Sequence, residues 1–129
     1  MLAIDTNIIV RYLTGDHPKQ SVAAQVLVDG YKVFVCTTVL METEWVLRSV
    51  YGFVPERIAN ALAAFAGLPN VTLENPELAA KALNWMEQGV DFADALHLVA
   101  ARECEAFVSF DRGFAKAANA ISDVKVRAP

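Results

Sequence analysis

The chain has 129 residues and a formal net charge of −4, with 11 Lys and Arg against 15 Asp and Glu. This length suits a single domain with a buried core, and we expect residues 1–129 to form one. No apolar run approaches the roughly 20 residues that span a bilayer, and no basic segment followed by an apolar one predicts an export signal. We therefore expect a cytoplasmic protein without a membrane association.

The apolar content of 55% is high for so short a chain, and the mean hydropathy is +0.33. We expect a partner to cover part of the apolar surface. The pI near 5.1 argues only weakly against nucleic-acid binding, because carboxylates that bind divalent cations also lower the net charge. Cys36 and Cys104 lack metal-ligand spacing, and we expect two buried free thiols rather than a disulfide.

Short apolar or β-branched runs alternate with longer helical patterns, separated by Gly, Pro and Asn. In chain order, the pattern predicts strand Leu2–Ile4, helix Thr6–Leu13, helix Lys19–Val28, strand Tyr31–Val35, helix Val39–Tyr51, helix Pro55–Ala66, strand Val71–Leu73, helix Pro76–Glu87, helix Phe92–Cys104, strand Phe107–Phe110, helix Phe114–Ala120 and an edge strand Val124–Val126. This alternation predicts an α/β fold whose mostly parallel sheet is covered by helices on both faces.

Acidic residues recur where predicted strands end. Asp5 and Asp111 each directly follow a strand, and Glu42 lies in the first turn of the helix after the strand Tyr31–Val35. Ligand sites of open parallel sheets form just beyond the carboxyl ends of the strands. The sheet therefore collects these three acids at one edge, whereas Asp94 is less constrained because its helix precedes its strand.

Glu42 and Glu44 lie on different sides of the same predicted helix. Glu42 has Val39, Trp45 and Val46 three and four residues away, so it lies among apolar neighbours, where a carboxylate is costly unless it is paired or bound to metal. Glu44 has Arg48 four residues later, which predicts a solvated salt pair. We therefore assign a functional role to Glu42 and a structural one to Glu44.

Helix capping is the alternative explanation for the other acids. Asp5 directly precedes a predicted helix, Asp111 is placed to cap the helix that contains Phe114, and Asp91 and Asp94 have the spacing of a capping box. For Asp91, capping is the better interpretation, whereas for Asp94 capping and function are equally favoured. His97 follows Asp94 by almost one turn, and we expect it to be a packed residue rather than a ligand.

Carboxylates that gather within a few ångströms repel one another unless they bind protons or a cation. Oxygen ligands suit Mg²⁺ or Mn²⁺, which can activate water and stabilise the leaving oxygen in phosphodiester cleavage. Thr6, Asn7, Thr38 and Ser109 are placed to orient water or phosphate. The chain has no Cys/His cluster for zinc, no Walker-type phosphate loop and only two histidines, so metal-assisted hydrolysis is the chemistry that remains.

Four segments resemble, in order, the motif blocks of PIN-domain nucleases: AIDTNIIVRYL, TVLMETEWVL, DFADALHLVAA and FVSFDRGF. The stretches DTNIIVRYLTGD and EWVLRSVYG resemble the VapC-type toxins of bacterial toxin–antitoxin pairs. The resemblance covers essentially the whole chain. It implies a three-layer α/β/α sandwich with a mostly parallel central sheet of four to five strands. It also implies a Mg²⁺- or Mn²⁺-dependent endoribonuclease that forms a homodimer and is silenced by a cognate antitoxin.

The resemblance assigns the metal ligands to Asp5, Glu42, Asp94 and Asp111, with Thr6, Asn7 and Ser109 as supporting polar residues. Many family members carry a second acid two residues after the last one, but here that position is Gly113, so the fourth ligand is the weakest assignment. Candidates for contact with RNA phosphates or the antitoxin are basic residues near these motifs, each with a plain surface role as the alternative: Arg11, Arg48, Arg112 and Lys116.

Two other functions stay open at this point. One is another Mg²⁺-dependent phosphoryl-transfer enzyme, although an aspartyl-phosphate phosphatase requires an Asp two residues after its nucleophile and position 7 is Asn. The other is a degenerate PIN domain that acts as a non-catalytic binding module, which Gly113 makes conceivable. The identity of the RNA, the number of metal ions and the antitoxin cannot be read from the sequence.

Overall fold

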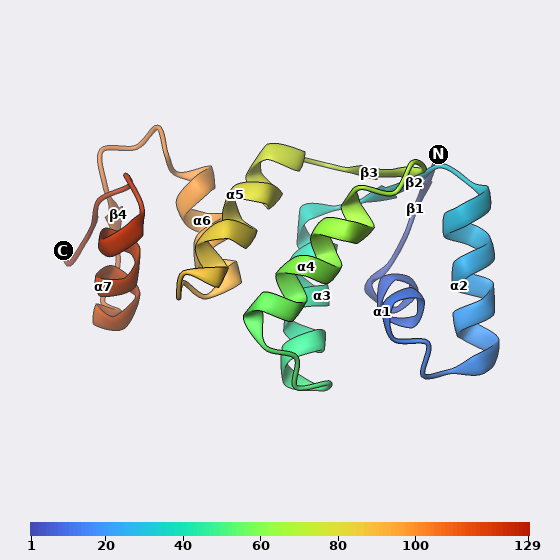
Figure 1. Cartoon of the computed structure of the whole chain (residues 1–129). Helices are drawn as coiled ribbons and strands as arrows, with labels where there is room; N and C mark the ends of the chain where they lie inside the picture. The colour runs from blue at the N-terminus through green and yellow to red at the C-terminus, as the bar shows by residue number, and fades with distance from the viewer. The chain divides into compact units, whose positions relative to one another are not determined.

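The computed structural model describes all residues from 1 to 129, and the chain divides into two compact units, Met1–Pro76 and Glu77–Pro129. Figure 1 colours the chain by residue number, and each unit is described here by itself. The expectation of one domain over residues 1–129 stays a prediction.

The first unit contains a three-stranded parallel sheet. Its strands are β1 (Leu2–Ala3), β2 (Val33–Val35) and β3 (Val71–Leu73), in the spatial order β1-β2-β3. Val33 pairs with Leu2 on one side and with Val71 on the other, so β2 is the central strand. Parallel neighbours need a crossover connection, and helical segments supply both crossovers.

Four helices complete the first unit: α1 (Thr6–Thr14), α2 (Pro18–Gly30), α3 (Thr37–Ser49) and α4 (Pro55–Ala66). Both α2 and α4 begin with Pro, which fits the first helical turn because its missing N–H has no partner there. Gly15 ends α1 with a φ of 64°, a left-handed conformation that a side chain would strain. Ile9, Val33, Leu47 and Ile58 are fully buried in the core.

The second unit pairs two short strands and packs three helices. Its helices are α5 (Pro76–Glu87), α6 (Phe92–Ala100) and α7 (Arg112–Ile121), and its strands are β4 (Phe107–Val108) and β5 (Val126–Arg127). The strands are parallel, with Phe107 opposite Val126. The Phe107 ring meets the Phe114 ring edge-on, with the centroids 5.5 Å apart, which joins the strand pair to α7.

The α/β class with parallel strands is confirmed, and the five strands form a sheet of three in one unit and a pair in the other. Every predicted element is present, and α4, β3 and α5 have the predicted boundaries, whereas the other boundaries are shifted. The helix predicted as Phe92–Cys104 ends at Ala100. Beyond it the Ala101 N–H bonds to both the His97 and Leu98 carbonyls, at 3.0 and 3.2 Å, which tightens the chain into turns.

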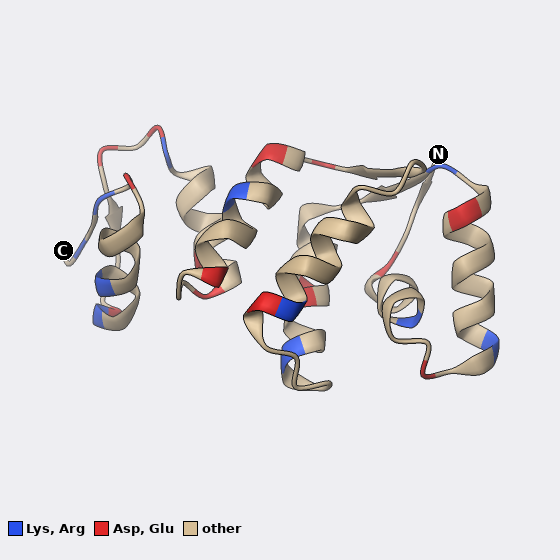
Figure 2. Ribbon diagram, viewed as in Figure 1, with Lys and Arg blue, Asp and Glu red and all other residues tan.

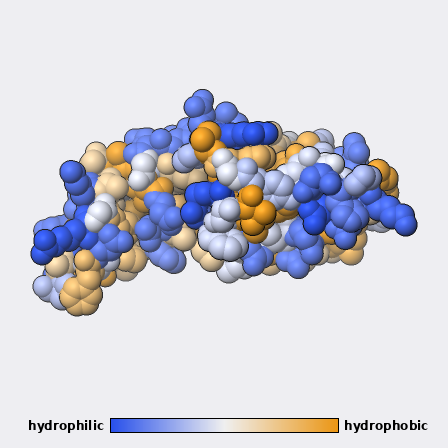
Figure 3. Space-filling model, turned by 90° about the horizontal axis from the view of Figure 1, so that it is seen from below, coloured by the Kyte–Doolittle hydropathy of each residue, from blue (hydrophilic) through white to orange (hydrophobic).

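No helix is long and apolar enough to cross a lipid bilayer. Figure 2 shows both acidic and basic positions on α2, α3, α4 and α5, and basic positions alone on successive turns of α7. Figure 3 shows apolar atoms as separate patches among polar ones on the visible face. Both cysteines are free, as predicted, but Cys36 is half-buried and Cys104 is exposed, so the expectation of two buried thiols is wrong.

Candidate active site

Asp5 caps α1 and lies just beyond the end of β1. Its backbone is extended (φ −90°, ψ 167°), and its carboxylate accepts a hydrogen bond of 2.7 Å from the Thr6 N–H. The capping interpretation is therefore confirmed. One carboxylate oxygen satisfies the helix N-terminus, and Asp5 as a whole remains exposed at the mouth of a pocket.

Thr6 connects the start of α1 to α3. Its hydroxyl donates a hydrogen bond to Oε1 of Glu42, although 36 residues separate the two in sequence. Thr6 is only 7% exposed, so its rotamer is fixed by packing and the hydroxyl is held toward Glu42. Of the three acids predicted at one edge of the sheet, Asp5 and Glu42 line one pocket of the first unit, whereas Asp111 belongs to the second unit.

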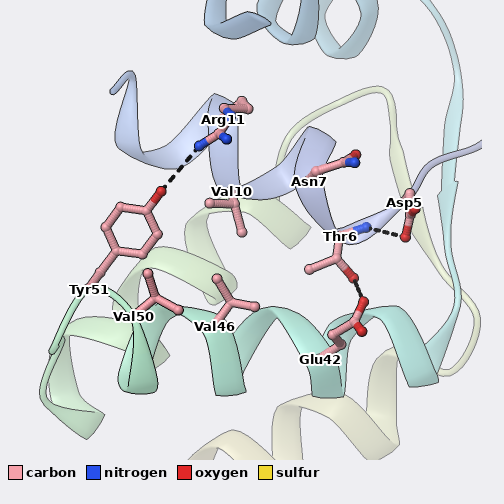
Figure 4. A pocket seen from close by; sticks show the side chains of 9 residues that line it. All are labelled: Asp5, Thr6, Asn7, Val10, Arg11, Glu42, Val46, Val50 and Tyr51. Carbon is pink, nitrogen blue, oxygen red and sulfur yellow. Dashed lines mark hydrogen bonds between the residues drawn. The ribbon is translucent and has the colours of Figure 1, made fainter. Parts of the chain in front are cut away.

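This first pocket has a volume of about 340 Å³, and the chemical character of its lining changes from one end to the other. Figure 4 shows carboxylate, hydroxyl and amide groups at one end, valine side chains in the middle, and an arginine with a tyrosine at the other end. The lining residues are Asp5, Thr6, Asn7, Val10, Arg11, Glu42, Val46, Val50 and Tyr51.

The second unit has its own acidic pocket of about 300 Å³, at the starts of α6 and α7. Asp91 caps α6 and accepts a hydrogen bond of 3.2 Å from the Asp94 N–H, so the capping prediction for Asp91 is confirmed. Asp111 caps α7 and accepts one of 2.9 Å from the Phe114 N–H. The lining residues are Gly89, Val90, Asp91, Asp94, Asp111, Gly113, Phe114 and Ala117.

Asp94 is the acid whose ionisation this second pocket opposes. Partial burial raises the pKa of its carboxyl above the usual value, and the negative charges of Asp91 and Asp111 raise it further. His97 acts in the opposite direction and lowers the pKa of Asp94. Carboxylates that repel one another in this way are a suitable environment for a divalent cation, which relieves the repulsion.

The donor set of both pockets suits Mg²⁺ or Mn²⁺, because it consists of oxygens without thiolates: carboxylate, hydroxyl and amide oxygens in the first pocket, and carboxylates in the second. Neither unit by itself brings three His, Cys, Asp or Glu side chains into a metal-binding group. Asp5 with Glu42 in one unit, and Asp94 with Asp111 in the other, are thus partial donor sets that retain room for water or phosphate oxygens.

The PIN domain family matches residues 2–120, almost the whole chain. The chain belongs to the PIN domain family. No curated protein matches this PIN domain. Among solved structures it is similar to the crystal structure of Mycobacterium tuberculosis VapC20, a toxin that cleaves the sarcin–ricin loop. That comparison has 23% sequence identity and a TM-score of 0.45, and covers 91% of this chain and 95% of the other.

Of the supporting residues predicted for this PIN domain, Thr6 and Asn7 line the first pocket, and Ser109 Oγ accepts a hydrogen bond of 3.0 Å from the Asp111 N–H. Thr38, in the first turn of α3, does not line either pocket. His97 is exposed, and its ring stacks on Phe107 with the centroids 6.4 Å apart.

The basic candidates differ in their surroundings. Arg11 lines the first pocket, whereas Arg48 lies outside it and donates from Nε to Glu44 Oε2 at 2.8 Å. Arg112 and Lys116 are exposed and lie one turn apart on α7, next to the cap residue Asp111. Arg11 is thus the cation that lines an acidic pocket, and Arg112 and Lys116 belong to the helix that Asp111 caps.

The expectation of a solvated Glu44–Arg48 pair is wrong for one partner. The pair forms, but Glu44 is 2% exposed while Arg48 remains partly open to solvent. The spacing rule identifies which side chains meet on a helix and says nothing of what packs over that face. Glu44 is therefore a buried structural carboxylate in this PIN domain, and Glu42, expected among apolar neighbours, is the exposed one of the two.

Sequence reasoning missed the far end of the first pocket. Tyr51 was assigned only as the end of a helix, and Asp16 as part of a helix-breaking loop, yet both belong to a hydrogen-bonded cluster with Arg11. Their contact joins residues 35 positions apart, which no local pattern reveals.

Proposed function

We propose that this PIN domain is a Mg²⁺- or Mn²⁺-dependent endoribonuclease of the VapC type, the toxin of a toxin–antitoxin pair. The observation that supports this proposal most strongly is the placement of the motif acids. Asp5 and Glu42 line one pocket of the first unit, and Asp94 and Asp111 line one pocket of the second. The chain belongs to a family of nucleases with acidic motifs, and one acid from each motif lines a pocket. Both observations favour this activity over a purely structural role.

In this proposal the metal ligands are Asp5 and Glu42 in the first unit, and Asp94 and Asp111 in the second. A bound Mg²⁺ or Mn²⁺ supplies an activated water and stabilises the charge that develops on the phosphodiester. Thr6 orients the Glu42 carboxylate, and Ser109 fixes the chain at Asp111. Asn7 offers an amide to the phosphate, and no covalent intermediate with the protein is expected.

The basic residues divide according to their contacts. Arg11 at the first pocket, and Arg112 with Lys116 at α7, are the residues proposed to bind RNA phosphates or an acidic segment of the antitoxin. Arg48 is bonded to buried Glu44, so we propose a structural role for it instead. A homodimer, a cognate antitoxin and a cytoplasmic location belong to the same proposal.

Controlled expression tests this biological class. We expect the wild-type chain to arrest growth, and co-expression of the antitoxin encoded by the adjacent reading frame to relieve the arrest. Asp94→Asn is expected to abolish the arrest at the same protein level, while Asp123→Asn, an exposed acid that lines neither pocket, retains it. Sequencing of RNA ends after induction identifies the cleaved RNA.

A non-catalytic binding module is the second candidate, and Gly113 is the observation that favours it. A Cβ placed at Gly113 would lie 3.4 Å from Oδ1 of Asp111, so the second acid of many family members would stand beside the first. Here only Asp111 is available. RNA binding without cleavage in Mg²⁺ or Mn²⁺ would support the module and exclude the nuclease.

A further inference from the structure

The end of the first pocket opposite Asp5 contains a cation and an aromatic ring held together by one carboxylate. Asp16 accepts hydrogen bonds from the Tyr51 hydroxyl at 2.6 Å and from Arg11 Nη1 at 3.0 Å. Arg11 Nη1 also lies 3.2 Å from the Tyr51 hydroxyl, and Thr14 donates to Asp16 at 2.8 Å. Two side chains that face the pocket are therefore fixed by a third that lies outside it.

Between the two ends the pocket has an apolar floor. Val46 and Val50 follow Glu42 at intervals of four residues along α3, and Val10 faces them from α1 (Figure 4). At 1.5 Å per residue, the floor extends for roughly 12 Å from Glu42 to Val50. The pocket thus has carboxylates at one end, valine side chains in the middle, and a tyrosine ring with a guanidinium at the other end.

This order of chemical groups matches one nucleotide of a single strand. An unpaired base has a flat face that stacks on aromatic or apolar side chains, and its phosphates pair with arginine. A base in a duplex has no free face to offer. The phosphate to be cleaved binds at the carboxylate end together with a cation. The neighbouring nucleotide then extends from that end over the valines.

We propose that Val10, Val46, Val50, Tyr51 and Arg11 form a subsite for the unpaired nucleotide adjacent to the cleaved phosphate of a single-stranded RNA. This inference rests on the proposed function and names its substrate class. The base stacks on Tyr51 over the valine floor, and Arg11 binds a phosphate. Asp16 is a positioning residue, because it touches both Arg11 and Tyr51 without lining the pocket.

Binding without cleavage tests the subsite directly. The probe is a fluorescein-labelled single-stranded RNA decamer of randomised sequence, measured by anisotropy with the full chain in EDTA. Loss of one stacked base is expected to weaken binding by roughly 5- to 150-fold in Tyr51→Leu, whereas Tyr51→Phe, which keeps the ring, retains most of the affinity. Tyr31→Leu, an exposed tyrosine outside the pocket, is the matched control and binds as the wild type does.

A backbone without bases separates stacking from charge. An abasic decamer is expected to bind the wild type more weakly than the RNA does, and Tyr51→Leu is expected to abolish most of that difference. Removal of one phosphate contact in Arg11→Met lowers the slope of log K against log salt by about 0.7. Arg57→Met, which removes an arginine stacked on Phe53 away from the pocket, leaves the slope unchanged.

Two results would overturn the subsite. One is wild-type affinity for RNA in Tyr51→Leu together with an unchanged salt slope in Arg11→Met. The other is unchanged RNA binding in both variants with loss of antitoxin binding, which assigns the pocket to a protein partner. Should Tyr51→Leu fail to fold, the salt slope of Arg11→Met decides alone. Cleavage by the wild type in Mg²⁺ tests the proposed function separately, so a nuclease with unaffected variants contradicts the subsite only.

Discussion

The hydroxyl of Thr6 donates a hydrogen bond to the carboxylate of Glu42, and thereby ties the first turn of α1 to α3. Thr6 follows Asp5, the cap of α1, so one dipeptide caps a helix and orients an acid from a second motif. The position of Asp5 suggested two roles, a helix cap and a metal ligand, and its hydrogen bond shows the cap. Helix capping and the proposed metal ligation use the same carboxylate rather than excluding one another.

The substitution Asp5→Asn separates helix capping from the proposed metal ligation. Asn caps helices about as well as Asp, so Asp5→Asn is expected to keep the free energy of unfolding within about 0.5 kcal/mol, whereas Asp5→Ala loses about 1 kcal/mol through the missing cap. Both variants are expected to lose Mg²⁺-dependent RNA cleavage. Urea denaturation and a cleavage assay measure the two effects, with Glu56→Gln, an exposed acid of α4, as the control. Full activity in Asp5→Asn would leave capping as its only role.

Thr6→Val tests the bond between the two motifs. The change keeps the shape and removes the donor, so Glu42 loses its fixed orientation and the protein is expected to lose about 1.5–3 kcal/mol of stability, the range for hydrogen bonds to charged groups. Cleavage is expected to fall in kcat more than in KM. In a double-mutant cycle with Glu42→Gln the two effects should be strongly non-additive. Additive effects would show that the hydroxyl and the carboxylate act independently.

Asp94→Asn probes the repulsion in the second pocket. The raised pKa of Asp94 means that its charged form is disfavoured in the folded state, so at pH 7 neutralisation is expected to raise the melting temperature in EDTA. The stability of the wild type correspondingly rises as the pH falls through the raised pKa of Asp94 toward the ordinary value of 3.8. Mg²⁺ is expected to stabilise the wild type more than Asp94→Asn. Equal Mg²⁺ shifts for both proteins would remove Asp94 from the metal site.

Asp16 gives a pH dependence of the opposite sign. Hydrogen bonds from Tyr51 and Thr14, together with the charge of Arg11, lower the pKa of Asp16 from 3.8 to about 2. Its stabilising contribution is therefore fully present above about pH 4 and is lost as the pH falls through 2. Measured by urea denaturation, the stability difference between the wild type and Asp16→Asn should be constant from pH 8 to 5 and shrink below pH 4. A difference that changes between pH 8 and 5 contradicts this origin.

Gly113→Asp introduces the second acid that many family members carry two residues after the position of Asp111. The Cβ at this position would lie 3.4 Å from Asp111 Oδ1, and an acid in the first turn of α7 also suits the helix dipole. We expect the variant to need less Mg²⁺ for half-maximal cleavage. Gly113→Asn, similar in size and without charge, should behave like the wild type. A higher Mg²⁺ requirement in Gly113→Asp would show that a single acid is the better arrangement here.

Local patterns in the sequence were enough to predict the elements and the capping acids. Asp5, Asp91 and Asp111 directly precede helices, and each accepts a hydrogen bond from a backbone N–H of the following turn. The parallel pairing of β1 with β2 followed from the helices between them. These features depend on neighbours a few residues apart, which is why a single sequence reveals them.

Features that depend on distant residues could not be predicted in this way. The burial of Glu44 depends on what packs over α3, and the cluster of Asp16 with Tyr51 joins a loop to the end of that helix. In the sequence, the valines of the first pocket form an ordinary apolar helix face. Only the structure places Val10 of α1 opposite Val46 of α3 in one pocket. Such contacts are specified by the fold as a whole.

We propose that the acids of the four motifs support metal-dependent cleavage of RNA. An RNA cleavage assay with and without Mg²⁺ is the direct test. A 5′-labelled single-stranded RNA is incubated with the purified full chain in Mg²⁺ or in EDTA, and the products are resolved by length. We expect discrete internal cleavage by the wild type in Mg²⁺, none in EDTA, and none by Asp5→Asn or Asp94→Asn in either. Cleavage that persists in EDTA, or in both variants with Mg²⁺, would contradict it.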